Sequence, residues 1–181
     1  SENELKEDIL TNNSKYIVTL NLFTEKLKSL FDDERVKCII EFSLADSLNK
    51  RLKVINELAS KIGIDNIETV HGRAEELARN KKYREAFDLC ISRAVANLAV
   101  LCEYCLPFIK VGGHLLAYKG PDAEEEVKMA EKAIKILGGK LIEIVSVDLD
   151  GYDHNIVVIE KINKTPSKYP RKAGTPGKEP I

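Results

Sequence analysis

Short apolar runs that end in small or charged residues constrain the fold of this chain most strongly. Residues 67–71 and 87–92 form two such runs, and a stretch with helical character follows each of them. Strands that alternate with helices are typical of a parallel α/β sheet. Such sheets bind ligands at the carboxyl ends of their strands. Residues 71–75 and 92–96 are therefore the first candidates for a functional site.

The rest of the chain extends this pattern and then changes it. Further strands are expected at residues 36–45 and 114–118, and helices at 48–62, 73–79, 98–111 and 122–137. Residues 141–149 and 156–162 are two more strands with no helix between them, which predicts an antiparallel hairpin. The expected fold class is thus α/β: a mostly parallel, Rossmann-like sheet that ends in an antiparallel hairpin, with helices on both faces.

Two segments flank the expected α/β domain, which covers residues 36–163. Residues 1–35 are expected to be a helical extension, because apolar side chains recur there at spacings of three and four: Tyr16, Leu20, Phe23, Leu27 and Leu30. Residues 164–181 form a tail rich in Pro, Gly and Lys. This tail is either a phosphate-binding patch or a solvated segment without fixed structure.

The cysteines and the apolar runs argue against several classes of protein. All four cysteines lie inside apolar runs, as small core residues do, rather than in a disulfide framework. Cys102 and Cys105 have metal-ligand spacing but share one expected helix, so we expect no metal site. No apolar run approaches the ~20 residues of a membrane span. We expect a cytoplasmic protein with no membrane partner, and a monomer.

Polar residues at the strand ends could carry chemistry. Asp46 begins a helix after a strand, where its carboxylate could bind ribose hydroxyls or cap the helix. Arg93 lies among small apolar residues, so it should either point into the cleft or pair with a carboxylate. Lys119 stands before the rigid corner Gly120-Pro121, where it could meet an RNA phosphate or the substrate base. The small residues Gly72 and Ala74 would let a flat adenine ring approach the backbone.

Several motifs occur together and in a fixed order, and their sum is more specific than any one of them. They are Asp46-Ser-Leu-Asn-Lys-Arg51, His71-Gly-Arg-Ala-Glu-Glu76, Ser92-Arg-Ala-Val-Ala96, Glu103-Tyr-Cys-Leu-Pro107, Lys119-Gly-Pro-Asp-Ala-Glu-Glu125 and Lys168-Tyr-Pro-Arg-Lys-Ala-Gly-Thr-Pro176. Over residues 42–181 the chain resembles the RsmG (GidB) family, class I methyltransferases that modify N7 of a guanine in bacterial 16S ribosomal RNA.

The resemblance implies S-adenosyl-L-methionine as the cofactor and the small ribosomal subunit, through its 16S RNA, as the partner. Guanine N7 has a free lone pair, so no general base is needed and catalysis depends on alignment and desolvation. The implied residues are Asp46, Ala74, Glu75 and Arg93 for the cofactor, Arg93 and Lys119 for catalysis, and Lys119, Lys168, Arg171 and Lys172 for RNA.

One departure from the family concerns a glycine-rich loop after its first strand, which ends in Gly-Phe-Pro-Gly and wraps the methionine part of the cofactor. This chain has no glycine before Gly63, and Ile40 and Leu44 are too close for a parallel crossover of ~10–12 residues. If loop residues are missing from a continuous numbering, the Cα atoms of Glu41 and Phe42 should lie beyond the usual ~3.8 Å.

If the loop is instead truly deleted, the chain would be a non-catalytic module that binds RNA or the ribosome. A third interpretation is a nicotinamide-dependent enzyme that uses Asp46 on the ribose. The expected hairpin and the absence of a Gly-x-Gly-x-x-Gly motif argue against that third interpretation.

Overall fold

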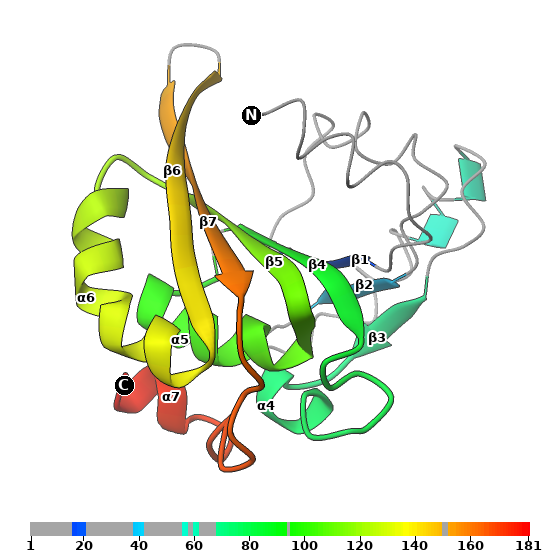
Figure 1. Cartoon of the computed structure of the whole chain (residues 1–181). Coiled ribbons are helices and arrows are strands. Elements are labelled where there is room, and N and C mark those ends of the chain that lie inside the picture. Colours follow the sequence, from blue (N-terminus) through cyan, green and yellow to red (C-terminus); the bar gives the residue numbers. More distant parts are fainter. Residues whose placement is uncertain are drawn as a thin grey trace.

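A single mixed sheet organises the computed structural model (Figure 1), which describes residues 16–20, 38–41, 56–57, 60–61, 68–93, 95–149 and 152–181. Within these residues the sheet has seven strands in the order β3-β2-β1-β4-β5-β7-β6. The strands are β1 (Tyr16–Leu20), β2 (Cys38–Glu41), β3 (Thr69–His71), β4 (Phe87–Arg93), β5 (Ile109–Lys119), β6 (Gly139–Leu149) and β7 (Tyr152–Lys161).

The pairing confirms the predicted change from parallel to antiparallel strands. Strands β3, β2, β1, β4 and β5 pair in parallel, whereas β7 pairs antiparallel with both β5 and β6. In register, Glu41 lies opposite His71, and Arg93 lies opposite both Leu20 and Tyr118. The carboxyl ends of all five parallel strands therefore lie at one edge of the sheet.

The structure corrects the prediction for residues 16–20, which form strand β1 rather than part of a helix. β1 lies between β2 and β4, and central parallel strands have continuous apolar runs instead of alternation. The β-branched residues Ile17, Val18 and Thr19 also favour a strand. Residues 16–20 thus belong to the sheet and not to a helical extension. The rest of residues 1–35, and the bond after Glu41, lie outside the described residues.

A second correction concerns the predicted helix that was expected to end at the Gly112-Gly113 pair. Helix α5 (Leu98–Cys105) ends earlier, and a short 3-10 helix (Leu106–Phe108) that contains Pro107 leads into β5. The glycines lie inside β5, opposite the irregular register between Phe87 and Leu89. A Cβ atom at Gly113 would clash with the Asp88 carbonyl oxygen, so close strand approach explains this glycine.

The described helices form one layer against the sheet (Figure 1). They are α4 (Ala74–Leu77), α5, α6 (Ala123–Ile136) and α7 (Thr175–Lys178). Helix α5 contacts α4, α6 and α7, and it is buried along most of its length. The core joins this helix to the sheet through fully buried side chains that include Leu98, Leu101, Phe108, Leu115 and Ile159. Of the helix expected at residues 48–62, residues 56–57 and 60–61 are described and are helical, and the rest lies outside the described residues.

Candidate functional site

The strand ends that the sequence singles out meet at the carboxyl edge of the sheet. His71 ends β3 and Arg93 ends β4, and the intervening strands β2 and β1 separate them by roughly 14 Å, given ~4.8 Å per strand. The corners at Gly72 and Ser92 therefore lie at the same edge of the sheet, whereas a shared crevice for an adenosine stays a prediction. Asp46, the third predicted corner, lies outside the described residues.

A pocket of about 460 Å³ opens beside the ends of β4 and β5. It lies between the segment that leads into α5 and the corner that follows β5. The residues that line it are Val95, Ala96, Asn97, Leu101, Tyr118, Lys119, Gly120 and Glu126. Asn97 caps α5 by accepting a hydrogen bond from the Val100 N–H at 3.1 Å. The pocket thus has an apolar wall and a charged floor.

Lys119 and Glu126 tie the two sides of this pocket together. Lys119 Nζ donates to the carbonyl oxygen of Ala96 and to Glu126 Oε2, both at 2.7 Å. The same carboxylate oxygen accepts the Leu98 N–H at 2.7 Å. Lys119 is only 8% exposed, so its ammonium is directed into the protein. The sequence had instead suggested that it faces an RNA phosphate.

Glu126 is a site residue that the sequence analysis missed. The acidic residues at the start of α6 suit the helix dipole, and that explanation covers Glu124 and Glu125, which are exposed. Glu126 instead turns inward to Lys119, seven residues earlier. The available signal was the lysine itself: a cation buried at a strand end needs an anion nearby.

Arg93 ends β4, where its side chain is half-buried. Its backbone lies opposite Tyr118 of β5. Burial raises the pKa of the Tyr118 hydroxyl, and the positive charge of Arg93 opposes that rise. Arg93 therefore acts electrostatically on the wall of the pocket, whereas its contact with a ligand in the cleft stays a prediction.

Ala74 and Glu75, the predicted adenosine contacts, begin α4 but are both buried. Ala74 is 3% exposed and belongs to the core, and Glu75 is 5% exposed. Glu75 Oε1 accepts a hydrogen bond from the backbone N–H of Gly174 at 2.8 Å. The carboxylate thus holds the C-terminal tail, an engagement that the sequence did not predict because the two residues lie 99 positions apart.

The tail is ordered against the helix layer, and Arg171 is its central anchor. Arg171 Nε and Nη2 donate to Glu103 Oε1 and Oε2 at 3.0 and 2.7 Å, and the Arg171 N–H also donates to Oε1 at 2.7 Å. The Glu103 side chain is 1% exposed. These hydrogen bonds raise the pKa of Arg171. Arg171 is thus turned away from the RNA contact expected for it, whereas Lys168 and Lys172 are exposed.

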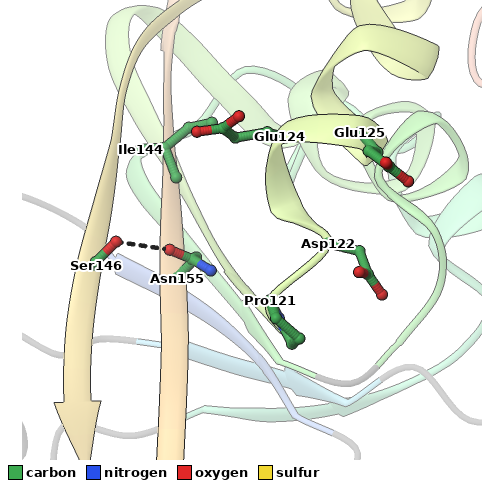
Figure 2. A pocket seen from close by; sticks show the side chains of 7 residues that line it. All are labelled: Pro121, Asp122, Glu124, Glu125, Ile144, Ser146 and Asn155. Carbon is green, nitrogen blue, oxygen red and sulfur yellow. Dashed lines mark hydrogen bonds between the residues drawn. The ribbon is translucent and has the colours of Figure 1, made fainter.

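A second pocket, of about 540 Å³, lies between the start of α6 and the β6–β7 hairpin (Figure 2). Asn155 joins its walls, because its amide nitrogen donates to the Gly120 carbonyl oxygen and its Oδ1 accepts from Ser146 Oγ, both at 2.9 Å. The lining residues are Pro121, Asp122, Glu124, Glu125, Ile144, Ser146 and Asn155. Its acidic rim distinguishes it from the pocket beside β4 and β5.

Three of the four cysteines pack in the core. Cys90, Cys102 and Cys105 are each 0% exposed, and burial raises the thiol pKa of Cys90 and Cys102. Within the part of the chain that the structure describes, no three side chains of the metal-binding types come together. A separate search of the same residues finds no helix with the length and apolarity to cross a membrane.

Comparison of the sequence with known families gives one clear match. The family model for rRNA small subunit methyltransferase G (GidB) matches residues 34–157. A relative with that name from Clostridium novyi is 59% identical over 140 residues, which are 76% of this chain and 58% of the relative. One from Alkaliphilus oremlandii is 55% identical over 144 residues, 78% of this chain and 60% of the relative. The chain thus spans about three fifths of the length of these relatives.

Solved structures with little sequence similarity share the fold. An rRNA methylase from Streptococcus thermophilus superposes with a TM-score of 0.58 at 18% identity, over 88% of this chain and 95% of that one. A mutant of MtNAS in complex with S-adenosylmethionine has a TM-score of 0.57 at 10% identity, over 90% and 60% of the two chains. These likenesses confirm the predicted class I methyltransferase architecture.

Proposed function

Because the chain belongs to the rRNA small subunit methyltransferase G family, we propose that it transfers a methyl group from S-adenosyl-L-methionine to N7 of a guanine in 16S ribosomal RNA. The family match carries this proposal, since residues 34–157 include the ends of β3, β4 and β5 at which the site lies. We propose the small ribosomal subunit, through its 16S RNA, as the partner and the cytoplasm as the location of the activity.

The cofactor would bind across the carboxyl edge, and it supplies the methyl group. Ala74, Glu75 and Arg93 are the described residues that we propose for it, together with Asp46. At the corner before α4, a Cβ atom on Gly72 would lie 3.0 Å from the Leu77 side chain, so this glycine lets the corner pack closely against α4. Glu75 would act there through the conformation of α4, since its carboxylate holds the tail.

The residues near the substrate would align it and exclude water. Guanine N7 already has a lone pair, so no side chain has to remove a proton and positioning dominates the rate. We place Arg93 beside the reacting groups. Lys119 is a positioning residue in this scheme: with Glu126 it fixes the Ala96 carbonyl and the Leu98 N–H that border the pocket.

The tail would contact RNA through its exposed lysines. Lys168 and Lys172 are the tail residues that we propose for phosphate contacts. Arg171 supports them by fixing the tail to Glu103.

Calorimetry followed by mass spectrometry tests the enzyme proposal. We expect S-adenosyl-L-methionine to bind with micromolar affinity, and 16S RNA incubated with the chain and labelled cofactor to gain one methyl group on a guanine. Arg93→Ala should abolish transfer, whereas Lys128→Ala on the exposed surface of α6 should not. RNA binding without cofactor binding would instead support the non-catalytic module, which the missing glycine-rich segment favours.

A further inference from the structure

Two segments that are far apart in the sequence form one surface at the side of the molecule. The loop after α4, residues 79–85, lies against residues 165–170 of the tail. Arg79 Nη2 donates to the Pro170 carbonyl oxygen at 2.6 Å. Arg84 donates to the carbonyl oxygens of Tyr169 at 3.0 Å and Thr165 at 2.9 Å. Backbone acceptors hold the two segments together, so their relative position does not depend on surface charges.

Exposed cations lie on these two segments and on the tail residues next to them. They are Arg79, Lys81, Lys82, Lys164, Lys168 and Lys172. Lys82 forms a salt bridge with Glu68. Among the described residues, Lys81, Lys164 and Lys168 form no salt bridge. The acid within these segments, Glu85, is already engaged: it accepts the Thr165 N–H at 2.9 Å and lies 3.8 Å from Lys161 Nζ. The surface therefore carries positive charge without a salt-bridge partner, among the described residues, at Lys81, Lys164 and Lys168.

The basic surface contrasts with the net charge of the whole chain, which is only −1. Exposed carboxylates gather at the start of α6 instead, at Asp122, Glu124 and Glu125. Such a separation orients a polyanion toward the basic surface and away from the acidic one. Lysines act as point charges for phosphates, and they need no particular base sequence. These features fit a nucleic acid backbone.

The position of the surface relative to the candidate site is equally informative. The loop leads into the amino end of β4, whereas Arg93 stands at its carboxyl end. A strand of this length places the two ends roughly 20 Å apart. When a guanine lies at the carboxyl edge, the composite surface would therefore contact nucleotides several positions away from it in the RNA.

We propose that the 79–82 loop and the tail lysines form a single phosphate-binding surface that holds RNA flanking the target guanine. This inference rests on the proposed function for the identity of the RNA. Lys81, which has no salt bridge among the described residues, is its central new member, and Arg79 and Lys82 flank it although they already bind the Pro170 carbonyl oxygen and Glu68. Arg84 and Arg171 build the surface from inside, through their hydrogen bonds to the tail and to Glu103, and do not contact the RNA.

A charge-reversal variant with a matched control tests the proposal. The test variant combines Lys81→Glu, Lys164→Glu and Lys168→Glu, and the control combines Lys128→Glu, Lys132→Glu and Lys135→Glu on exposed positions of α6. Both change the net charge equally. We expect the test variant to bind a 16S RNA fragment at least tenfold more weakly, with a salt-dependence slope about 2 smaller, since each phosphate contact contributes about 0.7–0.9. The control should bind like the unmodified chain.

The kinetic and thermal measurements separate the possible outcomes. KM for RNA should rise more than kcat falls, and both variants should unfold at similar temperatures. Equal weakening in the two variants, or unchanged binding in the test variant, would overturn the proposal. So would loss of binding to phosphatidylglycerol vesicles while RNA binding persists, which would indicate a membrane surface. If the unmodified chain binds RNA through these lysines but transfers no methyl group, the enzyme proposal fails and the surface stands.

Discussion

Two buried ion pairs contact the same helix, α5, at opposite ends, and they differ in what they connect. At the start of α5, Glu126 accepts both Lys119 and the Leu98 N–H, and the two charged residues lie only seven positions apart. Near the end of α5, Glu103 binds Arg171 from 68 positions away. The first pair shapes the pocket locally. The second closes most of the C-terminal half of the chain into a loop.

The difference suggests that the two ion pairs have different roles at the two ends of α5. The Lys119 ammonium makes single hydrogen bonds to a carbonyl and a carboxylate, in a segment that neighbouring elements already hold. Arg171 matches both oxygens of a carboxylate that is 1% exposed, and such bidentate pairs are among the strong ones. We therefore expect the first pair to affect activity more than stability, and the second to affect stability more than activity.

The largest effect is expected for Glu103→Gln. The amide keeps the shape but removes the charge, which leaves the half-buried Arg171 guanidinium without its anion. Breaking one side of a buried pair should lower the free energy of unfolding by about 3 kcal/mol, as measured by urea denaturation. The control is Glu131→Gln on the exposed side of α6, for which a change within about 0.5 kcal/mol is expected. A loss of the same size in both variants would contradict the special role of Glu103.

The buried ammonium of Lys161, just before the tail, should make the free energy of unfolding depend on pH. Its ammonium is 0% exposed and donates to the carbonyl oxygens of Leu106 and Ile109. Burial lowers its pKa from 10.5 to about 8, although Glu85 opposes this shift.

Between these two values the unfolded chain binds a proton that the folded chain has released, so stability should increase as pH rises. From pH 7.5 to 9.5 the unmodified chain should gain about 2 kcal/mol relative to Lys161→Met. Chemical denaturation at several pH values measures this difference. A constant difference across that range would show that the ammonium is not destabilised by burial.

Glu126→Gln is the counterpart of Glu103→Gln at the other end of α5. Lys119 would lose its anion, but the Ala96 carbonyl oxygen would still accept its hydrogen bond. We expect a loss of about 1.5 kcal/mol in unfolding free energy, in the range for hydrogen bonds to charged groups, together with a roughly tenfold lower kcat for RNA methylation. Glu125→Gln, next to it and exposed, should change neither. If stability fell more than for Glu103→Gln, the comparison would be reversed.

The smallest effect should come from Asn97→Ala at the start of α5. This change removes the cap on the Val100 N–H and should cost about 1 kcal/mol, measured as a shift of the urea midpoint. Asn97→Ser retains a capping oxygen and should restore most of that loss. A failure of the serine variant to recover stability would mean that Asn97 acts through the pocket and not through the helix.

Much of the fold was predictable because it depends on local patterns. The apolar runs at β3 and β4 and the turn-linked pair β6–β7 were recognised to within a few residues. β1 was not, because Tyr16 and Leu20 have the spacing of a helix as well as the composition of a buried strand. Gly112 and Gly113 resemble a helix terminator, and only the neighbouring strand shows why β5 needs them.

The site was less predictable, because its partners are far apart in the chain. A basic tail has the same sequence pattern whether its arginine faces solvent or a buried glutamate. Glu103 offered the one available signal: it is a charged residue within the otherwise apolar face of α5. Nothing near Glu75 in the sequence points to Gly174, which lies 99 positions later.

The order in which the chain is synthesised gives the tail anchors a further meaning. Glu75 and Glu103 leave the ribosome well before Gly174 and Arg171, their partners. Until residues 165–174 emerge, two carboxylates that the folded protein buries have nothing to neutralise or cap them, so burying them is unfavourable. We therefore expect the helix layer to close only after translation has passed the tail, and an arrested nascent chain to keep that layer open.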